Sequence, residues 1–364
     1  KASPILLDVI LPVGISFYTF HGLSYVIDIY YKRIKAEYNF VDYSLFVSYF
    51  PLLVAGPIER ATHLLPQVKV QRSFDLEKAK EGLAQFVWGL VKKVVIADTC
   101  ATYANAVFDN YPSMNSLSLM LGAIYFAFQI YGDFSGYSDM ALGMSKLFGI
   151  DLLKNFNYPY FSRDIAEFWR RWHISLSSWF RDYLYIPLGG SQGGMWFKIR
   201  NTFIIFLVSG FWHGANWTYV VWGLLNAIYF LPLLVLQKNR NNTGPVVVNF
   251  DWKGLQTVVN ILITFLLSTI AWVFFRAKSI TDAVLYLKQL VYNGDFSSQY
   301  LSNERYNYEI LLLIGVFVVV EWNNRNRVEP LSGRYSLVKF GLAIAAIMAL
   351  GTFSDYKEFI YFQF

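Results

Sequence analysis

The amino-acid sequence predicts an all-α protein that crosses a membrane several times. Hydrophobic residues make up 55% of the 364 positions and charged residues only 15%, which is too few to cover a soluble protein of this length. The 37 residues from 201 to 237 include no Asp, Glu, Lys or Arg. No soluble domain, repeat or long linker interrupts the pattern, so we expect one transmembrane domain over residues 1–364.

Several further charge-poor segments are long enough, alone or with their flanks, to cross a bilayer. They are residues 9–27, 110–132, 254–275, 310–320 and 340–354. Together they predict about eight to ten membrane segments. The chain starts at Lys1, no signal-peptide pattern precedes the first segment, and we expect the first helices of a longer protein to be missing.

Two shorter apolar stretches, residues 43–58 and 83–97, are more typical of re-entrant or interrupted helices. The second belongs to a predicted helix that Asp75 caps. Its charged residues, including Lys92 and Lys93, are expected at a solvated or lipid-facing edge, because long lysine side chains can reach an interface.

Residues 160–186 predict one interfacial helix. Asp164 and Glu167 form a capping-box pattern at its start. A stripe rich in tryptophan then lies opposite a polar stripe with Arg170, His173 and Arg181. Because tryptophan concentrates at membrane–water boundaries, we expect this helix to lie in or just under the interface. The glycines after it predict a plain loop.

The most informative residue is His213. One helix over residues 201–237 would be about 55 Å long, against about 30 Å of hydrocarbon, so the run must break. The Gly-Ala-Asn sequence directly after His213 predicts that break. An ionisable side chain at membrane depth is costly, and function is therefore its default interpretation. A histidine that is merely hydrogen-bonded in a helix bundle is the structural alternative.

The other histidines differ in their surroundings. A general base must reach its proton and be shielded from water, which suits His213 best. His173, flanked by arginines, suits binding an anionic group or orienting a substrate, or is simply hydrogen-bonded at an interface. His21 and His63 are expected to be structural.

Residues 129–143 place polar side chains beside an apolar span, and the candidates are Asp133, Ser135, Tyr137 and Asp139. The two acids predict either a water-accessible cavity or ion pairs with partners such as Arg170 and Arg181. A structural and a direct role remain open for them. A catalytic triad around Ser135 is a weaker alternative, because its neighbours do not match the Gly-x-Ser-x-Gly elbow of hydrolases.

Composition also limits other functions. The net charge of +6 is spread among membrane segments, which fits loops facing anionic lipid and not nucleic acid. The single cysteine, Cys100, excludes an internal disulfide and a cysteine-based metal cluster. No pair of histidines has zinc-like spacing, so we expect no metal and no tightly bound cofactor.

Four motifs, in this order, resemble the membrane-bound O-acyltransferase (MBOAT) family, in particular the bacterial branch with alginate O-acetyltransferase. They lie at residues 53–60, 129–143, 167–190 and 209–217. The resemblance implies a helical bundle around a central tunnel, with re-entrant and interfacial helices. It makes His213 the catalytic residue and His173 its second histidine, a position that is asparagine in other branches. Gly132 and the loop at Gly193 and Gly194 depart from the usual pattern.

The resemblance also implies an activity in the bacterial cytoplasmic (inner) membrane. An acyl group, expected to be acetyl, would pass from a cytoplasmic thioester (acetyl-CoA, another acyl-CoA or an acyl carrier) toward hydroxyls of an extracellular polysaccharide such as alginate. An extracytoplasmic partner protein would complete the transfer. Arg170, Arg171 or nearby lysines would meet the CoA phosphates. The remaining tunnel-lining candidates are Asp133, Ser135, Tyr137, Asp139, Trp212 and Asn216.

Three alternatives stay open. A D-alanyl or lipid-directed transferase would act on another envelope glycan. A transporter would use broken helices to line a path, and would keep its function when His213 is replaced by Gln. A non-catalytic scaffold for polysaccharide export would tolerate substitution of both His173 and His213.

Overall fold

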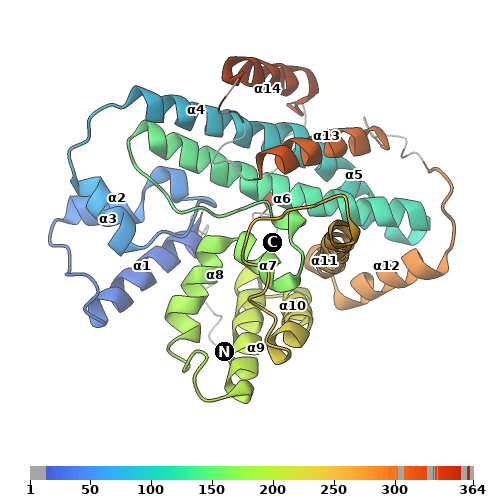
Figure 1. Cartoon of the computed structure of the whole chain (residues 1–364), viewed down its shortest axis with the longest axis horizontal. Coiled ribbons are helices and arrows are strands. Elements are labelled where there is room, and N and C mark those ends of the chain that lie inside the picture. The colour runs from blue at the N-terminus through green and yellow to red at the C-terminus, as the bar shows by residue number, and fades with distance from the viewer. Residues whose placement is uncertain are drawn as a thin grey trace, which may run out of the picture.

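The computed structural model describes residues 14–299, 301, 307–325, 331, 333, 335–353 and 359–360. Within these residues the chain is helical and has no strand, which confirms the predicted all-α class (Figure 1). The α-helices are α1 (Ile15–Tyr30), α2 (Phe40–Val47), α3 (Ala61–Lys69), α4 (Leu76–Leu90), α5 (Asp98–Asp109), α6 (Ser116–Leu147), α7 (Ile165–Arg171), α8 (Ile174–Phe180), α9 (Met195–His213), α10 (Trp217–Val235), α11 (Trp252–Arg276), α12 (Ile280–Tyr292), α13 (Glu309–Asn324) and α14 (Ser336–Leu350). Shorter 3-10 or π-helical segments are η1 (Phe50–Leu52), η2 (Val91–Ala97), η3 (Tyr111–Ser113), η4 (Pro159–Phe161) and η5 (Arg181–Tyr185).

Among the described residues, three helices are long and apolar enough to cross a membrane: α6, α10 and α11. This is fewer than the eight to ten segments expected, because several apolar stretches fold into shorter helices. Residues 43–58 divide between α2, η1 and loop, and residues 83–97 change from α-helix to π-helix at Val91. Part of the first predicted span, residues 9–13, lies outside the described residues.

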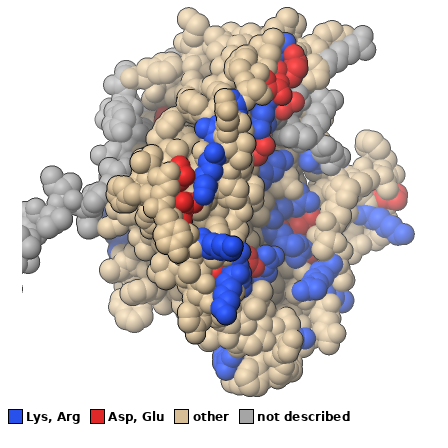
Figure 2. Space-filling view, turned by 90° about the vertical axis from the view of Figure 1, so that its left-hand side faces the viewer, with Lys and Arg blue, Asp and Glu red and all other residues tan. Residues whose placement is uncertain are grey.

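Figure 2 shows Lys and Arg side chains gathered around a hollow on the face at the left of Figure 1.

The central helix is α6, which lies along α4 in the middle of the molecule (Figure 1). Glycines make this contact unusually close. A Cβ added at Gly89 would collide with the backbone oxygen of Gly136, and one added at Gly136 would collide with that of Gly89. Gly82 and Gly143 form a second pair of the same kind. Small residues at both ends of the contact let the two backbones touch.

The hairpin of α9 and α10 uses the same device. A side chain at Gly210 would strike the carbonyl of Tyr219, and one at Gly223 would strike the carbonyl of Phe206. The chain breaks between the helices as predicted, because α9 ends at His213 and Asn216 caps α10 by accepting the amide hydrogen of Thr218. His213 is thereby fixed at the end of a tightly packed hairpin.

The prediction of one continuous helix over residues 160–186 is wrong. Asp164 does cap a helix, but that helix ends at Arg171, and His173 adopts a left-handed backbone conformation (φ 44°) before α8 begins. The break arises from a tertiary contact, since Asn155 accepts the amide hydrogen of Ile174 and the hydroxyl hydrogen of Ser175. Trp172 and Trp179 are buried in the protein core.

We expect Gly136→Val to destabilise the protein by at least about 2 kcal/mol, because the α4 backbone cannot move away from the added methyl groups. The matched control is Gly315→Ala on α13, where an added Cβ meets no atom within 4 Å. Thermal unfolding of both variants in detergent measures the difference. Equal melting temperatures would show that the close approach contributes nothing to stability.

Candidate active site

The two histidines that the sequence singles out meet at one aromatic side chain. The ring centroid of Trp212 lies 4.7 Å from that of His213 and 6.3 Å from that of His173. The two imidazoles are also close enough to interact electrostatically. His213 comes from the end of α9, and His173 comes from the break between α7 and α8.

Aromatic rings enclose the histidine pair. Trp222 of α10 and Phe275 of α11 lie edge-to-face against His213, with centroid distances of 5.1 and 5.0 Å. Phe134 of α6 lies edge-to-face against His173 at 4.6 Å. His173 is only 2% exposed, and its Nε2 makes no hydrogen bond to any residue that the structure describes. A ligand that donates to or accepts from this nitrogen would satisfy it.

A basic cleft of about 650 Å³ leads toward the pair. Arg170, Arg181, Lys198 and Arg240 line it, and its described lining includes no carboxylate. Its inner part is largely apolar and reaches Ser209, one helical turn before His213 on α9. The cleft thus joins a cationic mouth to the neighbourhood of the histidines.

Sequence reasoning missed Lys198 and Arg240 in this cleft. One helical face before His213 holds Lys198, Thr202 and Ser209. This spacing could have indicated that Lys198 lies on the same side of the helix as the site. Arg240 lies in the loop after α10, where no periodicity could have indicated it.

The predicted acids form a separate cluster with lysines. Asp139 pairs with Lys92 at 3.0 Å and Asp133 pairs with Lys93 at 2.7 Å, so the expected partners Arg170 and Arg181 are wrong. Lys92 is only 5% exposed, which also overturns its expected place at a solvated or lipid-facing edge. The reason is the glycine contact, which brings the start of η2 against α6.

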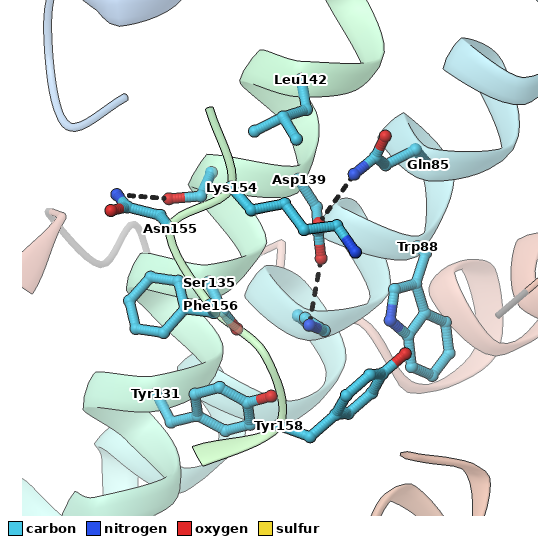
Figure 3. A pocket seen from close by; sticks show the side chains of 12 residues that line it. Gln85, Trp88, Tyr131, Ser135, Asp139, Leu142, Lys154, Asn155, Phe156 and Tyr158 are labelled. Carbon is cyan, nitrogen blue, oxygen red and sulfur yellow. Dashed lines mark hydrogen bonds and ion pairs between the residues drawn. The ribbon is translucent and has the colours of Figure 1, made fainter. Parts of the chain in front are cut away.

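This cluster borders a small polar cavity of about 40 Å³ (Figure 3). Lys92 also pairs with Glu321 at 3.2 Å, and Gln85 donates a hydrogen bond to Asp139 at 3.1 Å. Three buried polar atoms on the cavity wall have no hydrogen-bond partner among the described residues: Gln85 Oε1, Trp88 Nε1 and Ser135 Oγ. The volume suffices for about three water molecules, which would satisfy them.

Ser135 is therefore not part of a triad with a histidine. It lines the polar cavity, where its Oγ lacks a partner among the described residues. Two rings stand between that cavity and His173: Phe156 lies on the cavity wall and contacts Phe134 at 4.9 Å, and Phe134 contacts His173.

The remaining candidates have structural contacts. Arg170 donates hydrogen bonds to the carbonyls of Asn239 and Asn242 at the cleft, whereas Arg171 pairs with Glu167 at 2.8 Å. Asn216 caps α10 and donates to the carbonyl of Lys278. Tyr137 packs on Phe359 with a centroid distance of 5.5 Å.

The other two histidines, His21 and His63, both contact Glu59, whose side chain is buried. This agrees with the structural role expected for them. His63 Nδ1 lies 2.7 Å from the fully buried Glu59, and His21 Nε2 accepts the amide hydrogen of Glu59. The hydrogen bond to Glu59 raises the pKa of His63, in opposition to its partial burial.

The fold and the site define a class: a helical membrane protein in which two histidines, His173 and His213, meet one tryptophan side chain beside a basic cleft. The chain belongs to the membrane-bound O-acyltransferase (MBOAT) family, whose family model matches residues 30–275.

Characterised relatives carry related names. The chain is 44% identical over 280 residues to the probable alginate O-acetylase AlgI of Pseudomonas aeruginosa, covering 77% of this chain and 51% of that protein. It is 39% identical over 324 residues to the peptidoglycan O-acetyltransferase of Helicobacter pylori, covering 82% and 60%. It is 31% identical over 235 residues to the teichoic acid D-alanyltransferase of Streptococcus thermophilus, covering 59% and 55%. The chain thus spans between half and two thirds of these relatives.

The Glu59–His63 pair makes stability depend on pH. Because the pKa of His63 is raised, the ion pair is complete below about pH 6.5 and is lost as the pH rises through the folded-state value. His63 is 40% exposed, so we expect a loss of at most about 1 kcal/mol. Melting temperatures between pH 5.5 and pH 8.5 should fall for the wild type and stay flatter for His63→Gln. Parallel curves for the two proteins would contradict the pair's role.

Proposed function

We propose that this protein is a membrane O-acyltransferase that moves an acyl group, acetyl in the simplest case, from a thioester to a hydroxyl. The observation that carries the proposal is the pair His173 and His213, which lies among aromatic rings one helical turn beyond Ser209 of the basic cleft. Family membership and the acyl-transfer names of the relatives support it.

The chemistry needs a base and a group that stabilises charge. His213 accepts the hydroxyl proton of the acceptor while the oxygen attacks the thioester carbonyl carbon. The C–O bond forms, the C–S bond breaks, and His213 returns the proton to the departing thiolate. The unpartnered Nε2 of His173 faces no competing hydrogen bond from the described residues, so it can donate to the carbonyl oxygen as negative charge develops there.

The cleft fits a donor with phosphate at one end and a thioester at the other. Four cationic side chains offer charge-assisted hydrogen bonds to phosphate at its mouth. Fifteen residues of α9 separate Lys198 from His213, which is about 22 Å of helix. This span suits the extended pantetheine arm of an acyl-CoA or of an acyl carrier protein. Arg171 does not line the cleft, so we assign phosphate contact to Arg170, Arg181, Lys198 and Arg240, of which Arg181 also pairs with the neighbouring Asp182.

For the acceptor we propose hydroxyls of an envelope polysaccharide of the alginate type, reached through an extracytoplasmic partner protein, with this chain in the bacterial inner membrane. The support is the higher identity to alginate and peptidoglycan O-acetylating relatives than to the D-alanyltransferase. Transfer of D-alanine to teichoic acid is the second candidate, and it rests on relatives that are 29% and 31% identical.

We expect His213→Ala to lower polysaccharide acylation at least about 100-fold, since a positioned general base contributes that much or more. The measurement is ester content of the envelope polysaccharide in cells that carry the full-length protein at equal membrane levels. His63→Gln is the matched control, because it removes a histidine outside the site. Undiminished ester in His213→Ala cells would reject His213 as the base and favour a transporter or scaffold.

The proposed role of the cleft in binding the acyl donor can be tested by measuring the KM for that donor. Lys198→Ala combined with Arg240→Ala should raise the KM for acetyl-CoA about tenfold or more, since each lost charged contact costs about 1.5–3 kcal/mol before solvent screening. The kcat should change much less, because neither side chain is near the histidines. Initial rates in membrane vesicles, with Lys253→Ala as a control cation outside the cleft, measure the effect. A fall in kcat at constant KM would contradict the assignment.

A further inference from the structure

An apolar groove lies beside the histidine pair and is not used by the donor cleft. It occupies about 540 Å³ between α1, η5 and the helices α8 and α9. Phe20 and Val208 line it, and Trp212 closes its inner end toward the histidines. At its outer end Leu23 and Val208 are partly exposed, so the groove opens at the surface of the helical bundle.

The indole of Trp212 is a fixed wall between this groove and the site. It contacts both imidazoles of the site and two phenylalanines of α1. Phe20 lies edge-to-face at 5.3 Å and Phe17 at 5.9 Å. Contacts of this geometry are favourable and directional, so they hold the ring in place.

We propose that Trp212 determines the length of the acyl group that the enzyme transfers, an inference that rests on the proposed function. Aromatic rings pack on His213 from α9, α10 and α11, and Trp212 is one of them. In this arrangement a donor carbonyl beside His213 would accommodate an acetyl group, whereas a longer chain would meet the indole. Without the indole, the chain would continue into the groove, whose apolar walls would bury its methylene groups.

The test is a change in acyl preference and not a change in rate. Full-length wild-type protein and Trp212→Ala are compared in membrane vesicles with acetyl-, butyryl- and hexanoyl-CoA, and the ratio of kcat/KM for hexanoyl to acetyl is measured. The wild type should prefer acetyl. Trp212→Ala should shift the ratio toward hexanoyl at least about tenfold, because one methylene in an apolar pocket already changes preference by about that factor.

Two further variants separate chain length from general damage. Phe211→Ala removes the neighbouring ring, which is 71% exposed and does not line the groove, and should leave the ratio unchanged. Val208 lies one helical turn before Trp212 and lines the same groove. Val208→Trp added to Trp212→Ala should refill the groove and restore the preference for acetyl.

The outcomes are distinct. If the wild type transfers acetyl and Trp212→Ala keeps the wild-type ratio, the inference is wrong while the proposed function stands. If the wild type transfers no acyl group from any of the three donors, the proposed function fails and takes the inference with it. Should Trp212→Ala be absent from the membrane, Trp212→Leu and Trp212→Phe replace it, and an unchanged ratio in both overturns the inference.

Discussion

The contact between α4 and α6 is the constraint on which the rest of the structure depends. Paired glycines let the two backbones touch, and the chain then continues from α4 directly into η2. Lys92 and Lys93 consequently lie against carboxylates of α6, and those carboxylates satisfy charges that would each cost several kcal/mol to bury alone. Any residue larger than glycine at the contact would separate the lysines from their partners.

This arrangement divides α6 between two tasks. One part of the helix carries Asp133 and Asp139 into the ion-pair cluster, and Phe134 projects instead against His173. A charged network and an aromatic site therefore share one helix, and rings of Phe134 and Phe156 keep them apart. The separation leaves the histidines in an apolar setting, where electrostatic interactions with a reacting group are strong.

The sequence was sufficient for features that local chemistry determines. It predicted the helical class, the break after His213, and the caps at Asp75 and Asp164, both of which accept a backbone amide hydrogen in the structure. It also selected His173, Trp212 and His213, which the structure brings together.

Features set by distant contacts could not be predicted in this way. The helical stripe of residues 160–186 continues across His173 without a change of period, and the hydrogen bonds that Asn155 accepts from Ile174 and Ser175 interrupt the helix. The partners of Asp133 and Asp139 depend on which helix packs against the glycines of α6. The sequence of one segment alone does not indicate that helix. Arg240 enters the cleft from a loop for the same reason.

The left-handed backbone of His173 has one more consequence. Glycine and asparagine adopt this conformation readily, whereas β-branched residues resist it. A replacement at this position therefore alters two properties together, the imidazole and the ease of the chain reversal between α7 and α8. Asparagine, the residue that the family resemblance places here in other branches, removes the imidazole and still suits the reversal. Position 173 can thus lose its ring during divergence without losing the corner between α7 and α8.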